Sequence, residues 1–153
     1  MLQLYGKAHH DQARISNLAR WQGGIKDGGG TISTEAGVLH DAPYGFNSRF
    51  EGGKGTNPEE LIGAAQAGCF SMTLSMMLGQ QGLTAERIET QVAITLDIVG
   101  ENFQVMASHL TVMARIPGAD QAKFAEIANQ AKSVCPVSKL LNTTITMKAT
   151  LEA

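Results

Sequence analysis

Two stretches in the second half of the chain alternate between apolar and polar side chains. Over residues 88–98 the apolar side chains occupy even positions: Ile88, Val92, Ile94, Leu96 and Ile98. Residues 144–151 alternate in the same way. Alternation with a period of two is typical of a strand that has one face in the core. A turn at 100–102 connects the first stretch to a segment at 103–116, which ends at Pro117-Gly118. The sequence therefore predicts three strands, at 88–98, 103–116 and 144–151.

Apolar residues at helical spacing predict a helix after Asp120, which can cap its first turn. The apolar stripe of this helix consists of Phe124, Ile127, Ala128, Ala131 and Val134. A longer helix is predicted at 58–79, because Asn57 can cap it and Pro58 suits the first helical position. Gly79 or Gly82 can end it.

The helix at 58–79 is apolar on nearly all of its faces ("PEELIGAAQAGCFSMTLSMMLG"). A helix of this kind is buried on all sides or crosses a membrane. Polar side chains interrupt the apolar run, which favours a buried helix: Gln66, Ser71, Thr73 and Ser75. Since one small sheet cannot surround such a helix, we expect a second copy of the chain to cover it.

The first 55 residues are rich in glycine, which indicates turns and loops around short strands, with strands expected within 14–22 and 31–39. No internal repeat, charge block or low-complexity linker divides the chain. The predicted architecture is therefore a single α+β domain over residues 1–153. It has a mostly antiparallel sheet with a long buried central helix packed on it.

Composition narrows the possible functions. The chain has 153 residues, is 43% hydrophobic and 17% charged, and carries a formal net charge of −2. It therefore lacks the excess of positive charge that is typical of proteins that bind nucleic acid or an anionic membrane surface. Aromatic residues make up only 5%, so platforms for base stacking are not expected. The N-terminus has no continuous apolar region of the secretory type. We therefore expect a cytoplasmic protein, a compartment in which stable structural disulfides are rare.

The chain has two cysteines, Cys69 and Cys135, which are 66 residues apart. They form no CxxC motif, so neither a thioredoxin-type site nor a zinc-ribbon pair is present. A metal site would need histidines at ligand spacing to a cysteine. None of the four histidines has that spacing: His9, His10, His40 and His109.

The surroundings of the two thiols differ in the sequence. Cys135 precedes Pro136, where a short helix can start, and a helix N-terminus lowers a thiol pKa. Cys69 lies more than two turns inside the long helix, where burial raises the pKa and makes a thiol inert. Two interpretations of Cys69 follow: it is a small core side chain, or it reacts because a cation from elsewhere stabilises its thiolate.

Two cations lie just upstream, Arg49 and Lys54. Arg49 stands between Phe46 and Phe50, in a segment that is too apolar for an ordinary surface loop. The alternative for Arg49 is a surface ion pair, which would contribute little.

Two segments carry a family resemblance: "PYGFNSRFEGGKGTNPEELIGAAQAGCFSM" and "AKSVCPVSKLL". They strongly resemble the OsmC/Ohr family, the osmotically inducible and organic-hydroperoxide-resistance proteins. The likeness extends from about Trp21 to the C-terminus, and the glycine-rich N-terminal third points to the OsmC branch. The resemblance implies an intertwined homodimer that acts as a thiol-dependent peroxidase on organic hydroperoxides, with no metal or bound cofactor.

The same resemblance implies roles for four residues. Cys69 falls on the peroxidatic position and Cys135 on the resolving position, so that a Cys69–Cys135 disulfide forms in the cycle. Glu59 matches the family's glutamate ten residues before the reactive cysteine, and Arg49 matches the arginine of the OsmC branch. The implied reductant is an external dithiol, a dihydrolipoyl-bearing protein.

Helix geometry adds a constraint on this site. Glu59 and Cys69 are ten residues apart on one helix, hence about 15 Å apart along its axis. A second subunit whose long helix runs antiparallel would bring its own glutamate near this thiol. Two alternatives to a peroxidase remain, a ligand-binding or redox-sensing member of the same fold and a structural dimer with inert, buried cysteines.

Overall fold

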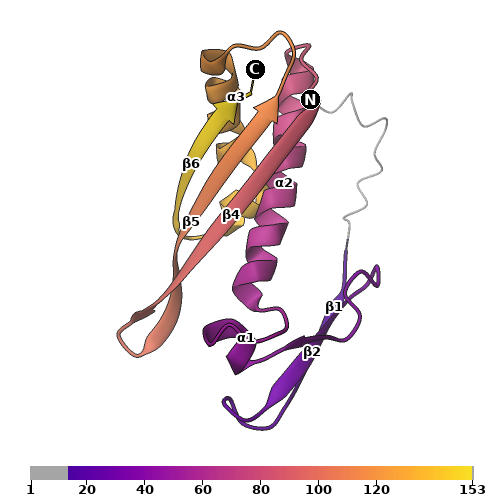
Figure 1. Cartoon of the computed structure of the whole chain (residues 1–153), viewed down its shortest axis with the longest axis vertical. Coiled ribbons are helices and arrows are strands. Elements are labelled where there is room, and N and C mark those ends of the chain that lie inside the picture. Colours follow the sequence, from indigo (N-terminus) through magenta and orange to yellow (C-terminus); the bar gives the residue numbers. More distant parts are fainter. Residues whose placement is uncertain (1–13, 153) are drawn as a thin grey trace. The chain divides into compact units, whose positions relative to one another are not determined.

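The computed structural model of the chain describes residues 14–152, which form two compact units that divide between Asn57 and Pro58. Each unit contains its own three-stranded sheet (Figure 1). The sequence predicted one mostly antiparallel sheet. The structure has two sheets instead, and three of their four strand pairs are antiparallel.

The first unit is a small antiparallel sheet followed by one short helix. Its strands are β1 (Asn17–Gln22), β2 (Gly29–Thr34) and β3 (Ala42–Tyr44), and the helix is α1 (Phe46–Phe50). The expected strands within 14–22 and 31–39 are confirmed with shorter or shifted bounds, whereas β3 and α1 were not predicted. Rings from opposite edges of this sheet meet, because Trp21 and Tyr44 have their centroids 5.5 Å apart.

The sheet of the second unit contains the three strands that the alternation pattern predicted. They are β4 (Arg87–Val99), β5 (Asn102–Arg115) and β6 (Thr144–Leu151). β4 and β5 form a long antiparallel hairpin, with Gly100 at a φ of 65° in its turn. β6 lies beside β5 and runs parallel to it, with Thr144 opposite Ala107 and Leu151 opposite Ala114.

The three helices of this unit are α2 (Pro58–Gln80), α3 (Gln121–Val134) and α4 (Pro136–Leu140). Asp120 caps α3 as predicted, since its carboxylate accepts a hydrogen bond from the Lys123 amide at 2.8 Å. α2 ends at Gln80 and is followed by a left-handed glycine, Gly82, whose φ is 71°. The amides of Gly82 and Leu83 then donate to the carbonyls of Gly79 and Leu78, which completes a Schellman motif.

The core of the second unit lies between the sheet and its helices. α2 packs against β4, α3 packs against β6, and the two helices also contact each other (Figure 1). Gly63 allows α2 to approach the sheet closely, because a Cβ at this position would lie 3.3 Å from the Val92 carbonyl oxygen. The largest fully buried apolar side chains are Phe70, Leu74, Leu78, Leu110, Val112 and Phe124.

Within one chain, α2 is buried along one stripe only. The buried positions follow one face at helical spacing: Gly63, Gln66, Phe70, Leu74 and Leu78. The position and length of this helix are confirmed, whereas its burial on all sides by a second copy of the chain stays a prediction. By length and composition α2 could also cross a membrane, but the core helix of a soluble protein passes the same test. The packing of its buried stripe against β4 favours a core helix.

Candidate functional site

The fold brings the two cysteines of the chain together. Cys69 lies near the middle of α2, and Cys135 lies between α3 and α4. α2 contacts both of those helices, and the two thiols lie close enough for each to shift the pKa of the other. Both are free thiols, with Cys135 buried and Cys69 half-buried. The site therefore contains a thiol pair built from segments that are distant in the sequence.

The backbone at Cys135 is fixed by the ends of two helices. Its amide donates to the Ala131 carbonyl at 2.9 Å, which closes α3, and its carbonyl accepts from the Lys139 amide at 3.0 Å, which opens α4. Pro136 at the start of α4 has no amide hydrogen to leave unpaired. The cysteine is thus the last residue held by one helix and the N-cap of the next.

This position favours the ionised form of Cys135. Its sulfur makes no capping hydrogen bond of standard geometry, yet the Ser138 and Val137 amides lie near enough to stabilise charge on it. Burial works against ionisation of the thiol, but the Ser138 amide, the Cys69 thiol, the Ser138 hydroxyl and the Val137 amide outweigh it. The pKa of Cys135 consequently lies below its ordinary value. The lowering expected at a helix N-terminus is confirmed.

Cys69 shifts in the opposite direction. Burial raises the pKa of its thiol, and the neighbouring Cys135 raises it further, both as a hydrogen-bond partner and as a charge. The Val137 amide and the Thr73 hydroxyl lower it by less. Within the second unit Cys69 is therefore the less readily ionised of the two thiols, as its place inside an apolar helix predicted.

A row of buried polar side chains lies next to the thiol pair. Gln66 on α2, Ser108 on β5 and Ser138 on α4 are all buried. The Ser108 hydroxyl donates to Gln66 Oε1 at 2.6 Å, and Gln66 Nε2 donates to Ser138 Oγ at 3.2 Å. This row was not predicted from the sequence, in which Gln66 appears only as a polar interruption of an apolar helix. Its place three residues before Cys69, on the same side of the helix, was the available signal.

The two charged residues that the sequence singled out lie in different units. Glu59 is in the first turn of α2, about 15 Å along the axis from Cys69 of its own chain. Arg49 is on α1 in the first unit, where its guanidinium carbon lies 5.1 Å from the centroid of the Phe50 ring. A cation–π contact of this kind holds an arginine beside an aromatic face. The role of Arg49 toward Cys69 stays a prediction.

Among the described residues, the other cations and the histidines suggest no further centre. Arg20 pairs with Asp41 at 3.3 Å, with both side chains largely exposed. His109 Nδ1 lies 2.6 Å from Thr146 Oγ1 on the exposed side of the sheet. Between residues 14 and 152, no group of three or more histidine, cysteine, aspartate or glutamate side chains could hold a metal ion. His9 and His10 lie outside the described residues.

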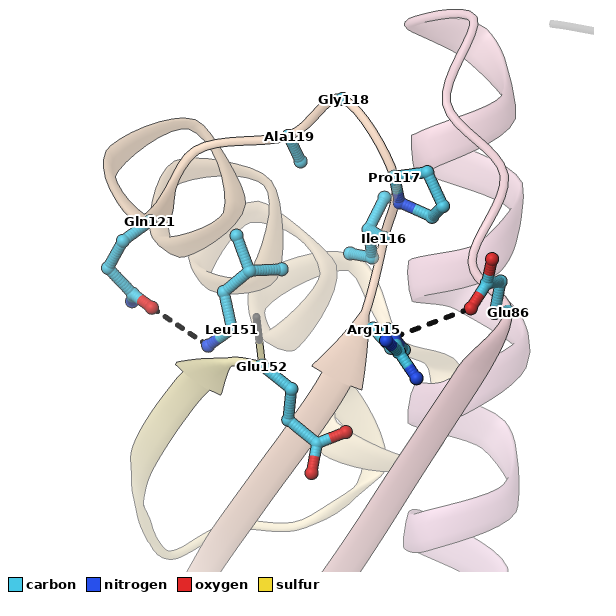
Figure 2. A pocket seen from close by; sticks show the side chains of 9 residues that line it. All are labelled: Glu86, Arg115, Ile116, Pro117, Gly118, Ala119, Gln121, Leu151 and Glu152. Atoms are coloured by element: carbon cyan, nitrogen blue, oxygen red, sulfur yellow. Dashed lines mark hydrogen bonds and ion pairs between the residues drawn. The ribbon is translucent and has the colours of Figure 1, made fainter.

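A cavity of about 490 Å³ lies at the far end of the second unit (Figure 2). Its polar side chains are paired: Arg115 Nε lies 3.5 Å from Glu86 Oε2, and Gln121 Oε1 accepts the Leu151 amide at 2.8 Å. Gln121 begins α3 and Cys135 follows its end, so about 20 Å of helix separates the cavity from the thiols. No cysteine, serine or histidine lines it. The thiol pair is therefore the better candidate for chemistry.

Comparisons with known proteins agree with the family resemblance. A family model described as OsmC-like protein matches residues 51–150. Peroxiredoxin OsmC of Escherichia coli is 51% identical over 135 residues, which cover 88% of this chain and 94% of that protein. Organic hydroperoxide resistance protein OhrB of Bacillus subtilis is 31% identical over 124 residues, 80% of this chain and 89% of that one. The crystal structure of OhrB superposes with a TM-score of 0.63, covering 88% of this chain and 98% of that chain at 28% identity.

Proposed function

The chain belongs to the OsmC-like protein family, and from this premise we propose that it is a cysteine-based peroxidase that reduces organic hydroperoxides to alcohols. The observation that carries the proposal is the pair of free thiols, Cys69 and Cys135, brought within reach of each other by α2, α3 and α4. The names of the relatives, a peroxiredoxin and organic hydroperoxide resistance proteins, support a redox role toward peroxides. In this proposal both compact units act as one OsmC-like domain in the cytoplasm.

In the first step of the proposed cycle, the Cys69 thiolate attacks the terminal peroxide oxygen. A sulfur–oxygen bond forms and the O–O bond breaks, so the thiol is oxidised to a sulfenic acid. The alkoxide that leaves takes up a proton and departs as an alcohol. The apolar side chains around α2 favour alkyl or fatty-acid hydroperoxides over hydrogen peroxide.

In the second step, the Cys135 thiolate attacks the sulfur of the Cys69 sulfenic acid. The disulfide forms, the sulfur–oxygen bond breaks, and the leaving hydroxide takes up a proton to become water. Closing the disulfide protects Cys69 from further oxidation to sulfinic acid. An external dithiol, which we propose to be a dihydrolipoyl group on a protein, reduces the disulfide by thiol exchange and becomes oxidised itself.

The first step needs a cation near Cys69, because burial raises the pKa of this thiol. We propose that Arg49 supplies it, both stabilising the thiolate and polarising the peroxide. Glu59 would hold the guanidinium by a bidentate ion pair, which an arginine forms and a lysine does not. The Phe50 ring already restricts where the Arg49 head group can lie.

This proposal is tested by counting free thiols after one equivalent of cumene hydroperoxide is added to the reduced protein. A peroxidase loses both thiols rapidly and regains both with dihydrolipoamide, because the oxidised product is a disulfide. A redox sensor of the same fold would react once and stay oxidised. A protein that keeps both thiols is a structural member of the family, and that result would refute the proposal.

We further propose an intertwined homodimer, formed around the exposed stripe of α2. This stripe carries mostly small side chains at a spacing of three and four residues: Ala65, Gly68, Met72, Ser75 and Gly79. Met72 is 76% exposed, and the space beside Gly68 and Gly79 is open. Spacing of this kind forms the seam between two packed helices. An antiparallel second copy would cover the seam and place its own Glu59 near this Cys69.

The dimer is expected to be obligate, with an interface above about 2,000 Å² and sites built from two chains. Analytical ultracentrifugation over a dilution series gives the mass.

Refolding Cys69→Ser chains together with Glu59→Ala chains then tests whether sites are shared, since mixed dimers regain one site with an intact Cys69 facing an intact Glu59. Activity should rise above both parents, and Glu60→Ala, one residue along the helix, is the control that should retain activity alone. A monomer at micromolar concentration contradicts the dimer, and no recovery in confirmed mixed dimers contradicts the shared site.

A further inference from the structure

The buried row of Gln66, Ser108 and Ser138 has no part in the two chemical steps proposed above. Gln66 and Ser108 are fully buried, and Ser138 is 6% exposed. Burying a primary amide is unfavourable unless its hydrogen bonds are made inside the protein. These three residues come from α2, β5 and α4; α2 also carries Cys69, and α4 begins at Cys135. The row is therefore built into the site and does not belong to the surface.

The hydrogen bonds in this row run in one direction. A glutamine amide has an accepting end and a donating end, and a hydroxyl has one hydrogen to donate. Ser108 Oγ donates to Gln66 Oε1, so the NH₂ end of the amide faces Ser138. Because Ser138 Oγ accepts that hydrogen, its own hydrogen remains for another acceptor.

A candidate acceptor lies at the start of the same short helix. Cys135 is the N-cap of α4, and Ser138 is the third residue inside it. The side chain of an N-cap faces the backbone amide of the third helical residue, and both the amide and the hydroxyl of Ser138 act on the Cys135 thiol. The sulfur of Cys135 is thus the neighbour toward which the Ser138 hydroxyl can turn.

We propose that Gln66 and Ser138 are positioning residues for Cys135. Gln66 fixes the Ser138 hydroxyl so that its hydrogen is donated to the Cys135 sulfur, an arrangement that favours a negative charge on that sulfur. Ser108 fixes the amide of Gln66 in turn. The part of this inference that concerns the resolving step rests on the proposed function, whereas the orientation of the hydroxyl does not.

The electrostatics of Cys135 support the inference. The pKa of this thiol lies below its ordinary value although burial opposes ionisation, and the Ser138 hydroxyl is one of the groups that lower it. From α2, Cys69 is the titratable group that interacts with it. No lysine is among the groups that shift the pKa of Cys135. Lys132 of α3 donates to the Ile145 carbonyl at 3.4 Å, and Lys139 of α4 and Lys148 of β6 are exposed.

The consequence for the proposed cycle is a resolving thiol that ionises more readily than an ordinary cysteine. Attack on the sulfenic acid requires the thiolate, so a larger thiolate fraction favours this step. Gln66 also lies three residues before Cys69 on α2, so the same amide links the turn that carries one thiol to the helix that carries the other. The row would thereby also fix the position of the Cys69 sulfur relative to the Cys135 sulfur.

The experiment follows the ionisation of Cys135 by the ultraviolet absorbance of its thiolate, in a Cys69→Ala background where it is the only thiol. Ser138→Ala should raise the titration midpoint by about one pH unit, a tenfold change in the ionisation constant, because a hydrogen bond to a charged group is lost. Ser138→Thr keeps the hydroxyl and should restore the midpoint. Ser133→Ala is the matched control, since Ser133 is exposed at the end of α3 and its hydroxyl donates to the Asn129 carbonyl.

Gln66→Glu tests the direction of the row independently. A carboxylate at this position accepts from both serines and draws the Ser138 hydrogen away from the sulfur, so the midpoint should rise at least as far as in Ser138→Ala. An unchanged midpoint in both Ser138→Ala and Gln66→Glu, with native circular dichroism, would overturn the inference, as would an equal rise in Ser133→Ala. If the midpoints move as expected but wild-type protein consumes no peroxide, the proposed function fails and the positioning role stands.

Discussion

Replacing Cys69 with serine is expected to abolish peroxide reduction, whereas Cys135→Ser should still consume about one equivalent of peroxide. A hydroxyl at position 69 cannot form the sulfenic acid on which the cycle depends. Without the resolving thiol, Cys69 forms that acid once and is then oxidised further to sulfinic acid. Mass spectrometry of each variant after peroxide treatment identifies which sulfur has gained oxygen.

The opposite assignment, in which Cys135 attacks the peroxide, has a physical basis, because Cys135 is the more readily ionised thiol within its own unit. Its pKa is lowered, while burial raises the pKa of Cys69. If sulfinic acid appears on Cys135 in the Cys69→Ser variant and that variant still consumes peroxide, the roles of the two thiols are reversed. The control is the double variant, which should consume none.

Arg49→Ala is expected to slow peroxide attack by well over tenfold while the fold stays intact, because each pKa unit is a tenfold change in the thiolate population. The sign follows from the raised pKa of Cys69: the neutral thiol persists to higher pH, and the rate rises with pH through that pKa. Removing the proposed cation should move this rise to higher pH. The pH dependence of Cys69 alkylation, followed site by site, measures the movement.

Two further substitutions make this test specific. Arg49→Lys should rescue only part of the rate, since a lysine cannot form the forked pair with Glu59. Arg20→Ala is the matched control, because Arg20 is an arginine of the same unit that pairs with Asp41. An unchanged midpoint in Arg49→Ala, together with a raised one in Arg20→Ala or Lys54→Ala, would transfer the role to that residue.

The elements that the sequence predicted best are those whose pattern is local. Period-two alternation located β4 and β6 to within a residue of their observed bounds. The acidic cap at Asp120 and the left-handed Gly82 marked the start of one helix and the end of another, because each acts on the turn next to it. These patterns can be recognised in the sequence without knowing which residues pack against the helix or strand.

The features that escaped prediction depend on partners distant in the sequence. Alternation is the same in a parallel and an antiparallel strand, so the parallel pairing of β6 with β5 was not foreseen. α1 has five residues, too few to show a helical period. Gln66 is polar in an apolar helix, and only the positions of Ser108 and Ser138 show why it is buried.

For the candidate site, the residues themselves predicted the direction of both thiol pKa shifts. Helix position alone distinguishes Cys69, inside an apolar helix, from Cys135, at a helix start. Their proximity followed from the family resemblance and not from spacing, since 66 residues of chain separate them. The partner of Arg49 was not predicted from the residues alone, because Arg49 and Cys69 lie in different compact units.

The parallel pairing of β5 and β6 also determines the order in which the thiol pair can be assembled during synthesis. Parallel neighbours cannot be joined by a tight turn, so the chain from Arg115 to Thr144 must cross back over the sheet. That crossing contains α3, Cys135 and α4, and it is anchored at its far end by β6, which leaves the ribosome after every other described element. Contacts between distant segments form late because closing the intervening loop costs entropy. Cys69 is therefore translated, and its helix can form, well before the fold provides it with a neighbouring sulfur.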